Sequence, residues 1–412
     1  MKVNRSKILY ISSIVPDTSC GAHIAIYRHL VVKNDFDVAV CSYSPDAAMT
    51  EKKFKIKRYK LLDRFFHSRI SRLAYNIEYL VNWVWLPPSL LAYGRQFQPD
   101  VIMTVPDNMH SGLAFQLAKK LSVPLVPDFQ DLFPISRFIP QFMEPYPLVR
   151  KFLLGKFLKL HRRSPLVFYT SEGMMDFFGK HPEPNILYPV GDFNIARLPL
   201  KHSDVTSIGP VNLVYAGNCY GAYGRMLLRF AKLVKNSETV KLKIFPVGKG
   251  WSDNDIREMT EAGIYQSFMP FEKLKEEFAK ADAFLTVMSF EEQESPFVRT
   301  SFTTKWLDYA PYAKPIFVWG PDYSSAVIFA KKHDCGVVIN KNEPGALLEA
   351  VKKIKEDSAQ WRLFSKNAKA ASEDVLNPEV IHSIFVRGIL RAIKKNTSPK
   401  LSVDAKKETI VA

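Results

Sequence analysis

The segment SFTTKWLDY contains side chains of the types that suit a nucleoside diphosphate. They are Ser301, Thr304, Lys305 and Asp308. Their spacings of three, four and seven residues predict one shared face on a short helix over 302–310, with Ser301 as its N-cap. Hydroxyls, an ammonium group and a helix N-terminus suit a diphosphate, and a carboxylate further along suits ribose hydroxyls. The segment predicts a nucleotide lying along the helix; a capped amphipathic helix with a surface ion pair is the alternative.

Glycine-rich turns follow two apolar runs in the same half of the chain, GNCYGAYGR (217–225) and VGKG (247–250). Glycines let backbone N–H groups approach an anion at a helix N-terminus, and an arginine adds a fork of donors. The spacing is not G-x-G-x-x-G, which argues against a dinucleotide site. The candidate anion-binding residues are Gly217, Gly221, Gly224, Arg225 and Gly248. Loops that merely turn the chain are the alternative.

Two series of short apolar runs, each run followed by a helical pattern, would position these residues. Such alternation is typical of parallel sheets covered on both faces, and ligands bind where their strands end. The predicted fold is α/β, with two Rossmann-like doubly wound domains facing a cleft. The predicted strands are KILYISSIV (7–15), FDVAVCSY (36–43), DVIMTVP (100–106), VPLVPDF (123–129) and LVFYT (166–170), then VNLVYAG (211–217), KLKIFPVG (241–248), AFLTVMS (283–289), KPIFVWG (314–320) and CGVVI (335–339).

Length and composition agree with two folded domains. The chain has 412 residues, too many for one ordinary core, and 47% of them are hydrophobic, which excludes disorder of the whole. The four cysteines form no C-x-x-C pair, which argues against a disulfide framework or a zinc site and fits a reducing cytosol. No uncharged stretch reaches the roughly 20 residues that span a bilayer. We expect domains over 1–195 and 205–375, an amphipathic helix over 378–394 and a disordered tail over 396–412.

The formal net charge of +16 predicts an anionic partner. The excess is concentrated in two segments: Lys52 to Arg72 has nine basic residues and one acid, and Arg150 to Arg163 has six basic residues and no acid. Both interleave Phe, Leu and Ile with the cations, and Trp83 and Trp85 follow the first. On a helix this pattern favours an anionic membrane surface. RNA binding and a solvated face over core aromatics are the alternatives.

The second half resembles the nucleotide-binding half of bacterial group 1 (family-4-like) glycosyltransferases, which are two-domain enzymes of the GT-B fold. The matching elements are GNCYGAYGR, the later V-G-x-G, the segment S-F-x-T-K-x-x-D-Y and a following A-K-P-I. The resemblance implies that Arg225 and Lys305 neutralise the donor diphosphate, that Asp308 binds the ribose, and that the last helix packs back on the first domain. It also implies that Gly21, in a loop after the first strand, faces the donor.

Two elements of the first half extend the resemblance. DFQDLFP (128–134) resembles the D-L-W-P element of lipid-linked-sugar glycosyltransferases, which implies that Asp131 contacts the acceptor hydroxyl. Gln130 stands where many relatives have His. His110 is either a polar contact for donor or acceptor or an ordinary histidine at a helix start.

The chain departs from the family at two acids. Asp308 replaces the usual Glu, and Thr300 stands where many members have a second, sugar-facing Glu. Glu291, Glu292 and Glu294 lie nearby in the sequence but out of register, so which of them, if any, faces the donor sugar stays open.

The resemblance implies a glycosyltransferase that moves a sugar from a nucleotide-sugar to a hydroxyl of a lipid-linked glycan in exopolysaccharide or cell-surface polysaccharide biosynthesis. Retention of configuration, no metal ion, no cofactor and no nucleic-acid partner are expected. The expected location is the cytoplasmic face of the cell membrane. A non-catalytic protein that binds sugar-nucleotides or nucleic acid through a degenerate GT-B site is the alternative.

Overall fold

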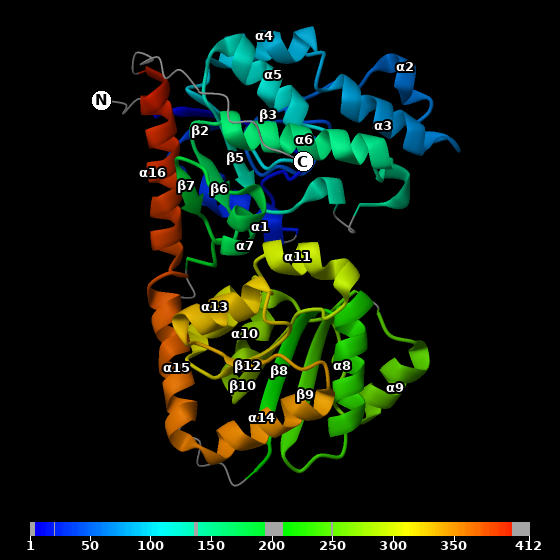
Figure 1. Ribbon diagram of the computed structural model, residues 1–412, viewed down its shortest axis with the longest axis vertical. Helices are drawn as coiled ribbons and strands as arrows, with labels where there is room; N and C mark the ends of the chain where they lie inside the picture. The colour runs from blue at the N-terminus through cyan, green and yellow to red at the C-terminus, as the bar shows by residue number, and fades with distance from the viewer. Residues whose placement is uncertain (1–4, 20, 136–138, 194–208, 249, 398–412) are drawn as a thin grey trace, which may run out of the picture.

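Two parallel β-sheets, one in each half of the chain, form the framework of the protein (Figure 1). The structure is a computed structural model that describes residues 5–19, 21–135, 139–193, 209–248 and 250–397. Strands within each sheet pair in parallel wherever the structure records a register, and helices cover the sheets. The predicted fold class is therefore confirmed as α/β with two Rossmann-like domains.

The first sheet has the strand order β3-β2-β1-β4-β5-β6-β7. Its strands are β1 (Lys7–Ile11), β2 (Asp37–Ser42), β3 (Lys52–Lys55), β4 (Val101–Thr104), β5 (Leu125–Phe129), β6 (Val167–Tyr169) and β7 (Pro184–Ile186). The helices of this half are α1 (Gly21–Tyr27), the π-helix η1 (Arg28–Val32), η2 (Pro45–Ala47), α2 (Lys60–Asp63), α3 (Ser71–Val81), α4 (Pro88–Phe97), α5 (Ser111–Leu121), η3 (Phe133–Ile135), η4 (Gln141–Met143), α6 (Pro147–Arg163) and α7 (Glu172–Phe178).

The second sheet has the order β12-β11-β10-β8-β9. Its strands are β8 (Val211–Asn218), β9 (Val240–Val247), β10 (Ala283–Val287), β11 (Ile316–Trp319) and β12 (Val337–Ile339). The helices that follow in the chain are α8 (Gly221–Val234), α9 (Asp253–Glu261), α10 (Phe271–Lys280), η6 (Glu292–Glu294), α11 (Ser295–Thr300), α12 (Lys305–Tyr309), η7 (Ala310–Tyr312), α13 (Ser325–His333), α14 (Pro344–Glu356), α15 (Ser358–Glu373) and α16 (Pro378–Thr397).

Burial on both faces explains why the strands read as continuous apolar runs. Successive side chains of a strand point to opposite faces. In β1, Ile8 and Tyr10 join one hydrophobic cluster while Leu9 and Ile11 join another, and all four are fully buried. A sheet covered on both sides leaves no outward position that would favour a polar residue.

The long helix α16 lies along the first domain, whereas α15, which precedes it, lies along the second (Figure 1). The ring of Phe385 stacks on that of Phe168 in β6, and a Cβ on Gly388 would lie 2.5 Å from the Phe168 ring. This close approach explains a glycine in the middle of the helix. The cluster that includes Ile8 continues through α16 into the second domain, so both halves share buried apolar surface.

Three expectations differ from the structure in detail. The basic segment after Lys52 begins as the edge strand β3 instead of a helix, and lysines on an edge strand discourage pairing with another chain. The helix expected over 302–310 is shorter, because α12 begins at Lys305 and Ser301 ends α11. Helix α16 runs to Thr397, three residues past its expected end; residues 398–412 of the expected disordered tail lie outside the described residues.

Candidate functional site

A pocket of about 530 Å³ lies between the two domains. The first domain contributes residues from the loop after β1, from α1 and from η1, and the second domain contributes the starts of α10 and α12. Three residues singled out from the sequence line it together: Gly21, Thr304 and Asp308. The domains are close here, because a Cβ on Gly21 would lie 3.5 Å from the methyl group of Thr304.

Lys305 and Asp308 are the ionisable side chains of α12, and both are partly buried. Lys305 Nζ lies 4.9 Å from the centre of the ring of Tyr215, within β8. Burial lowers the pKa of Lys305, whereas Asp308 and the Cys219 thiol act in the opposite direction. The ammonium group therefore lies beside the first glycine turn.

Asp308 combines burial with several charged neighbours. Burial raises its pKa to about 7, Arg28 and Lys305 partly oppose this rise, and Asp192 adds to it. A carboxyl that titrates near neutrality exchanges two acceptor oxygens for one acceptor and one donor as it takes up a proton. Its capacity to accept hydrogen bonds from two vicinal hydroxyls therefore increases as the pH rises through 7.

The glycine turns meet two different requirements. Gly217 has φ of +137°, and a Cβ there would lie 2.9 Å from Lys305 Nζ, so a side chain at this position would displace the cation. Gly224 packs its α-carbon against the backbone of residue 219, where a Cβ would lie 2.0 Å from the carbonyl oxygen. Gly224 is thus required by packing in its own right. Gly221 and Gly248 have positive φ angles, which turn the chain at the start of α8 and after β9.

Arg225, in the second turn of α8, forms an ion pair with Glu291 in the loop after β10. The arginine side chain remains 62% exposed, so its remaining N–H groups are accessible. Glu291, one of the three acids that the sequence left open, thus contacts a candidate phosphate-binding residue. Glu292 and Glu294 lie in the short helix η6 that follows.

The segment after β5 meets the second domain through Asp131. The hydroxyl of Ser301 lies 3.3 Å from Asp131 Oδ1, and burial raises the pKa of Asp131. Ser301 thus contacts the first domain instead of capping α12. Gln130 donates a hydrogen bond from Nε2 to Asp128 Oδ2 at 2.7 Å. Thr300 is 2% exposed and its carbonyl accepts a hydrogen bond from Ser171, so this position lies in the contact between α11 and α7.

His110 is engaged inside the first domain. It is 2% exposed, its Nδ1 lies 3.1 Å from Asp107 Oδ2, and its Nε2 accepts a hydrogen bond from the Tyr43 amide at 3.3 Å. This network fixes the tautomer with the proton on Nδ1. The geometry favours the packing role that the sequence left open over contact with a ligand.

Three charged pocket residues were missed by the sequence reasoning: Arg28, Asp192 and Glu272. Arg28 follows Gly21 by seven residues, a spacing that places both on one face of a helix and that would have identified it. Asp192 lies in the segment before the second domain and Glu272 at the start of α10, and neither carries a recognisable motif. They reach the pocket only because the chain folds the two domains together.

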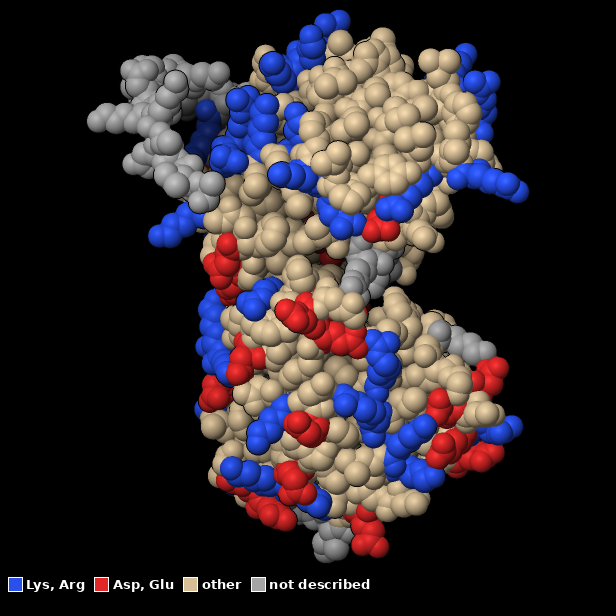
Figure 2. All heavy atoms as spheres, turned by 45° about the vertical axis from the view of Figure 1, so that its right-hand side comes forward, with Lys and Arg blue, Asp and Glu red and all other residues tan. Residues whose placement is uncertain are grey.

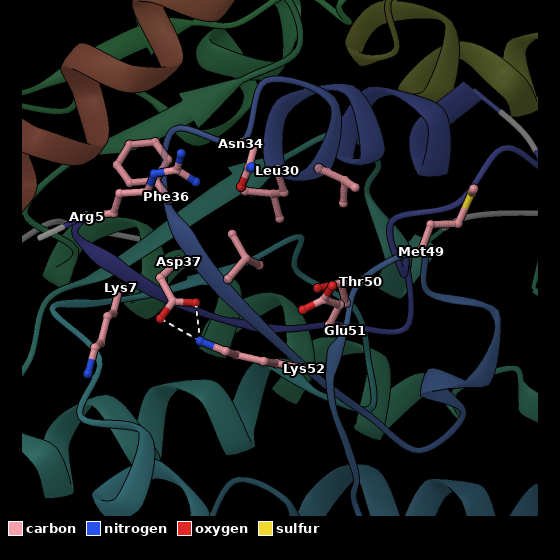
Figure 3. Close-up of a pocket in the computed structure, with 12 residues that line it drawn as sticks. Arg5, Lys7, Leu30, Asn34, Phe36, Asp37, Met49, Thr50, Glu51 and Lys52 are labelled. Atoms are coloured by element: carbon pink, nitrogen blue, oxygen red, sulfur yellow. Dashed lines mark hydrogen bonds and ion pairs between the residues drawn. The ribbon is translucent and has the colours of Figure 1, made fainter. Parts of the chain in front are cut away.

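A larger pocket, of about 860 Å³, lies at the other end of the first sheet (Figure 3). It is lined by the starts of β1, β2 and β3, and Lys52 pairs there with Asp37. Its lining includes none of the site residues singled out from the sequence. Within the described ranges, no group of three or more His, Cys, Asp or Glu side chains is arranged to hold a metal ion.

One face of the first domain exposes an apolar stripe, which we call the α3 face. It consists of Ile70, Leu73, Ile77, Leu80, Val84 and Trp85, which are 37% to 74% exposed. The only acid of α3, Glu78, points inward and is fully buried. The right-hand side of Figure 1, where α3 lies, comes forward in Figure 2, which shows a broad surface without charges, Lys and Arg around it and few acids. Trp83, expected with Trp85 on a basic surface, is buried.

The described helices include none that combines the length and apolar character needed to cross a bilayer.

No family model matches the sequence, and no curated protein matches it.

Comparison with solved structures identifies the fold. The chain is similar to Alr3699/HepE of Anabaena in complex with UDP, with 13% identity over 93% of this chain and 99% of that one and a TM-score of 0.65. It is similar to sucrose-phosphate synthase of Thermosynechococcus elongatus, with 12% identity over 95% and 100% and a TM-score of 0.63. The lipopolysaccharide outer core galactosyltransferase WaaB follows with 13% identity over 93% and 99% and a TM-score of 0.57. The two Rossmann-like domains of this chain are thus arranged in the GT-B fold of these structures.

Proposed function

We propose that the protein is a glycosyltransferase that moves a sugar from a nucleotide-sugar to a hydroxyl of a lipid-linked glycan, in exopolysaccharide or other cell-surface polysaccharide biosynthesis. The observation that carries the proposal is the pocket between the domains, which Gly21, Thr304 and Asp308 line together. Lys305, which follows Thr304 in the chain, lies beside Gly217. The structures of Alr3699/HepE with UDP and with UDP-glucose support a nucleotide-sugar as the donor.

In this proposal the donor lies along the second domain. Asp308 accepts hydrogen bonds from the ribose, Thr304 and Ser301 contribute hydroxyls, and Lys305 with Arg225 neutralises the diphosphate. Amides of the glycine turns at Gly217, Gly221 and Gly248 add donors, and Gly21 lets the first domain approach the phosphates. Gly224, whose amide donates to the Tyr220 carbonyl, serves the packing of the turn. The ammonium group beside Gly217 supports this assignment.

The chemistry that the site would perform is departure of the nucleoside diphosphate from the anomeric carbon. Arg225 and Lys305 stabilise the negative charge that develops on the leaving group, and the anomeric carbon gains oxocarbenium character. We propose that the reaction needs no metal ion or other cofactor, because two cationic side chains provide the charge that a metal would supply. Retention of configuration is proposed from the resemblance to group 1 glycosyltransferases alone.

Asp131 is proposed as the acceptor contact. Its carboxyl group meets Ser301 across the domain boundary, so an acceptor hydroxyl held by Asp131 lies where the two domains meet. Gln130 holds the neighbouring Asp128 and so supports this segment. We assign no substrate contact to His110, whose ring nitrogens are engaged within the first domain.

The proposed location is the cytoplasmic face of the membrane. The α3 face supports it, because outward-facing aliphatic side chains and Trp85, with lysines and arginines nearby and few acids, suit an anionic lipid surface. A lipid-linked acceptor would then be drawn from the surface on which the acceptor-binding domain lies. No nucleic-acid partner is proposed.

The test is a thermal-shift panel of UDP, GDP, dTDP and ADP, followed by release of nucleoside diphosphate from the matching nucleotide-sugar. A ligand at 100 times its Kd stabilises a protein by about 2.7 kcal/mol, which is enough to rank the four. We expect one of them to raise the melting temperature of the wild type and not that of Lys305→Met. If none of the four shifts the wild type, the proposal fails.

The alternative is a non-catalytic binding protein with a degenerate site. Thr300 favours this alternative, because it is a buried threonine at a position where many group 1 glycosyltransferases have an acid. Such a protein would bind the nucleotide without consuming nucleotide-sugar, even with lipid extract as acceptor. A nucleic-acid binder would instead bind RNA with an affinity that falls steeply with salt and is independent of nucleotide-sugar.

A further inference from the structure

Arg28 enters the donor pocket from the first domain, and its position is fixed from two sides. Its Nη1 donates a hydrogen bond to the Val190 carbonyl at 2.8 Å. The next residue, His29, is buried, and its Nδ1 lies 3.0 Å from Nδ1 of His382 in α16. Both residues open the π-helix η1, a kind of helical turn that is frequent at functional sites. The backbone that bears Arg28 is therefore held against α16 while its side chain lines the pocket.

The charges around Asp308 come from four elements. Arg28 of η1 and Lys305 of α12 are the cations that act on its carboxyl group, and Asp192 is the anion. Glu272 of α10 lines the same pocket. Asp192 and Glu272 are themselves paired with Lys275, at 3.4 Å and 2.8 Å. Arg28 is the cation that the first domain places in this cluster, where its charge interacts with Asp192 first and with Asp308 of the second domain next.

We propose that Arg28 is a positioning residue for the donor: from the first-domain side of the shared pocket, its charge favours the carboxylate form of Asp308, which offers both oxygens to the ribose hydroxyls. This inference rests on the proposed function, since it assigns a role in binding the proposed donor. It goes beyond that function by making the ribose site depend on both domains. A nucleotide would bind fully only when η1 faces α12, so closure of the domains and ionisation of Asp308 favour each other.

The dependence of nucleotide affinity on pH tests the proposal. Titration calorimetry with UDP, GDP, dTDP and ADP between pH 5.5 and 9 would be compared for wild type, Arg28→Met, Arg28→Lys and Asp308→Asn. Phosphate groups also titrate near pH ~6, and the Asp308→Asn profile records that contribution separately. Arg95→Met, at an exposed arginine of α4, is the matched control.

For the wild type we expect affinity to increase through about pH 7, where Asp308 ionises. Arg28 acts to lower the pKa of Asp308, and a nearby opposite charge lowers a carboxyl pKa by ~1–3 units, so Arg28→Met should move the midpoint upward by about one unit. Arg28→Lys, which keeps the charge, should restore most of the shift. In Asp308→Asn this midpoint should be absent, and adding Arg28→Met should have no further effect on the profile.

The proposal is overturned if Arg28→Met weakens binding equally at every pH, which would indicate a purely structural role, or if it leaves the profile unchanged. In either case the proposed function stands as long as Lys305→Met still loses nucleotide. If no nucleotide of the panel binds to the wild type, both proposals fall.

Discussion

Ser301 Oγ and Asp131 Oδ1 lie 3.3 Å apart, although the two residues belong to different domains. Ser301 ends α11 directly before the segment that carries Thr304 and Lys305, and Asp131 follows β5 of the first sheet. A hydrogen bond between these side chains therefore links the proposed acceptor contact to the start of the proposed donor helix. The proposed donor site and acceptor contact would therefore meet at the interface between the two domains.

Replacing Asp131 by Asn should separate acceptor chemistry from donor binding. The amide keeps the size of the side chain but removes its capacity to hold a proton. We expect transfer to a lipid-linked acceptor to fall by about 10²-fold, the lower end of the usual contribution of a proton-transfer group. Nucleotide affinity should stay within about twofold of the wild type. An equal loss of both would instead place Asp131 in the donor site.

Lys305→Met should weaken nucleoside diphosphate binding by about 10- to 100-fold, because a hydrogen bond to a charged group contributes roughly 1.5–3 kcal/mol. Methionine fills a similar volume without charge, so the loss reports the ammonium group and not a cavity. Lys280→Met, at a lysine whose side chain is 65% exposed, is the control and should bind like the wild type. Calorimetric titration measures both. Wild-type affinity in Lys305→Met would contradict the assignment of the diphosphate site.

The fold could be predicted from the sequence because its strands are buried on both faces, which produces runs such as KILYI that have no other ready explanation. Strand β3 escaped prediction, since this edge strand carries lysine at three of its four positions and lacks that signal. The start of α12 was misplaced because the hydroxyl of Ser301 bonds to Asp131, a partner 170 residues away in the sequence. Arg28 could have been found by its seven-residue spacing from Gly21, but its place in one pocket with Asp308 is created by folding.

The α3 face should determine attachment to anionic lipid. Ile77→Glu combined with Leu80→Glu places two negative charges on an outward stripe without touching the core, so folding should be preserved. We expect the wild type to sediment with vesicles containing phosphatidylglycerol and less with pure phosphatidylcholine, and the double variant to remain in the supernatant with both.

The matched control for this experiment is Leu363→Glu, at a leucine of α15 that is 45% exposed and belongs to the second domain. It should sediment like the wild type. If the double variant still binds vesicles, another surface makes the contact. If it changes the oligomeric state in light scattering, the α3 face pairs two copies of the chain instead.

Asp128, on β5 beneath Gln130, should make the stability of the protein depend on pH. Burial raises its pKa to about 7, and its Oδ1 has no hydrogen-bond partner. The ordinary value for an aspartate is 3.8, so between about pH 4 and 7 the folded protein holds a proton that the unfolded chain has released. The stability that this group contributes is therefore fully present below about pH 4 and is lost as the pH rises to about 7.

In Asp128→Asn this contribution should disappear. The free energy of unfolding, measured by urea titration from pH 4 to 8, should decline less steeply by up to about 1.4 kcal/mol per pH unit, which is the slope for one proton. The variant should also exceed the wild type in stability at pH 8, because it buries no charge. Asp46→Asn, at a carboxylate that is 84% exposed, is the control and should reproduce the wild-type slope. An unchanged slope in Asp128→Asn would show that the buried carboxyl group is stabilised as an anion by its surroundings.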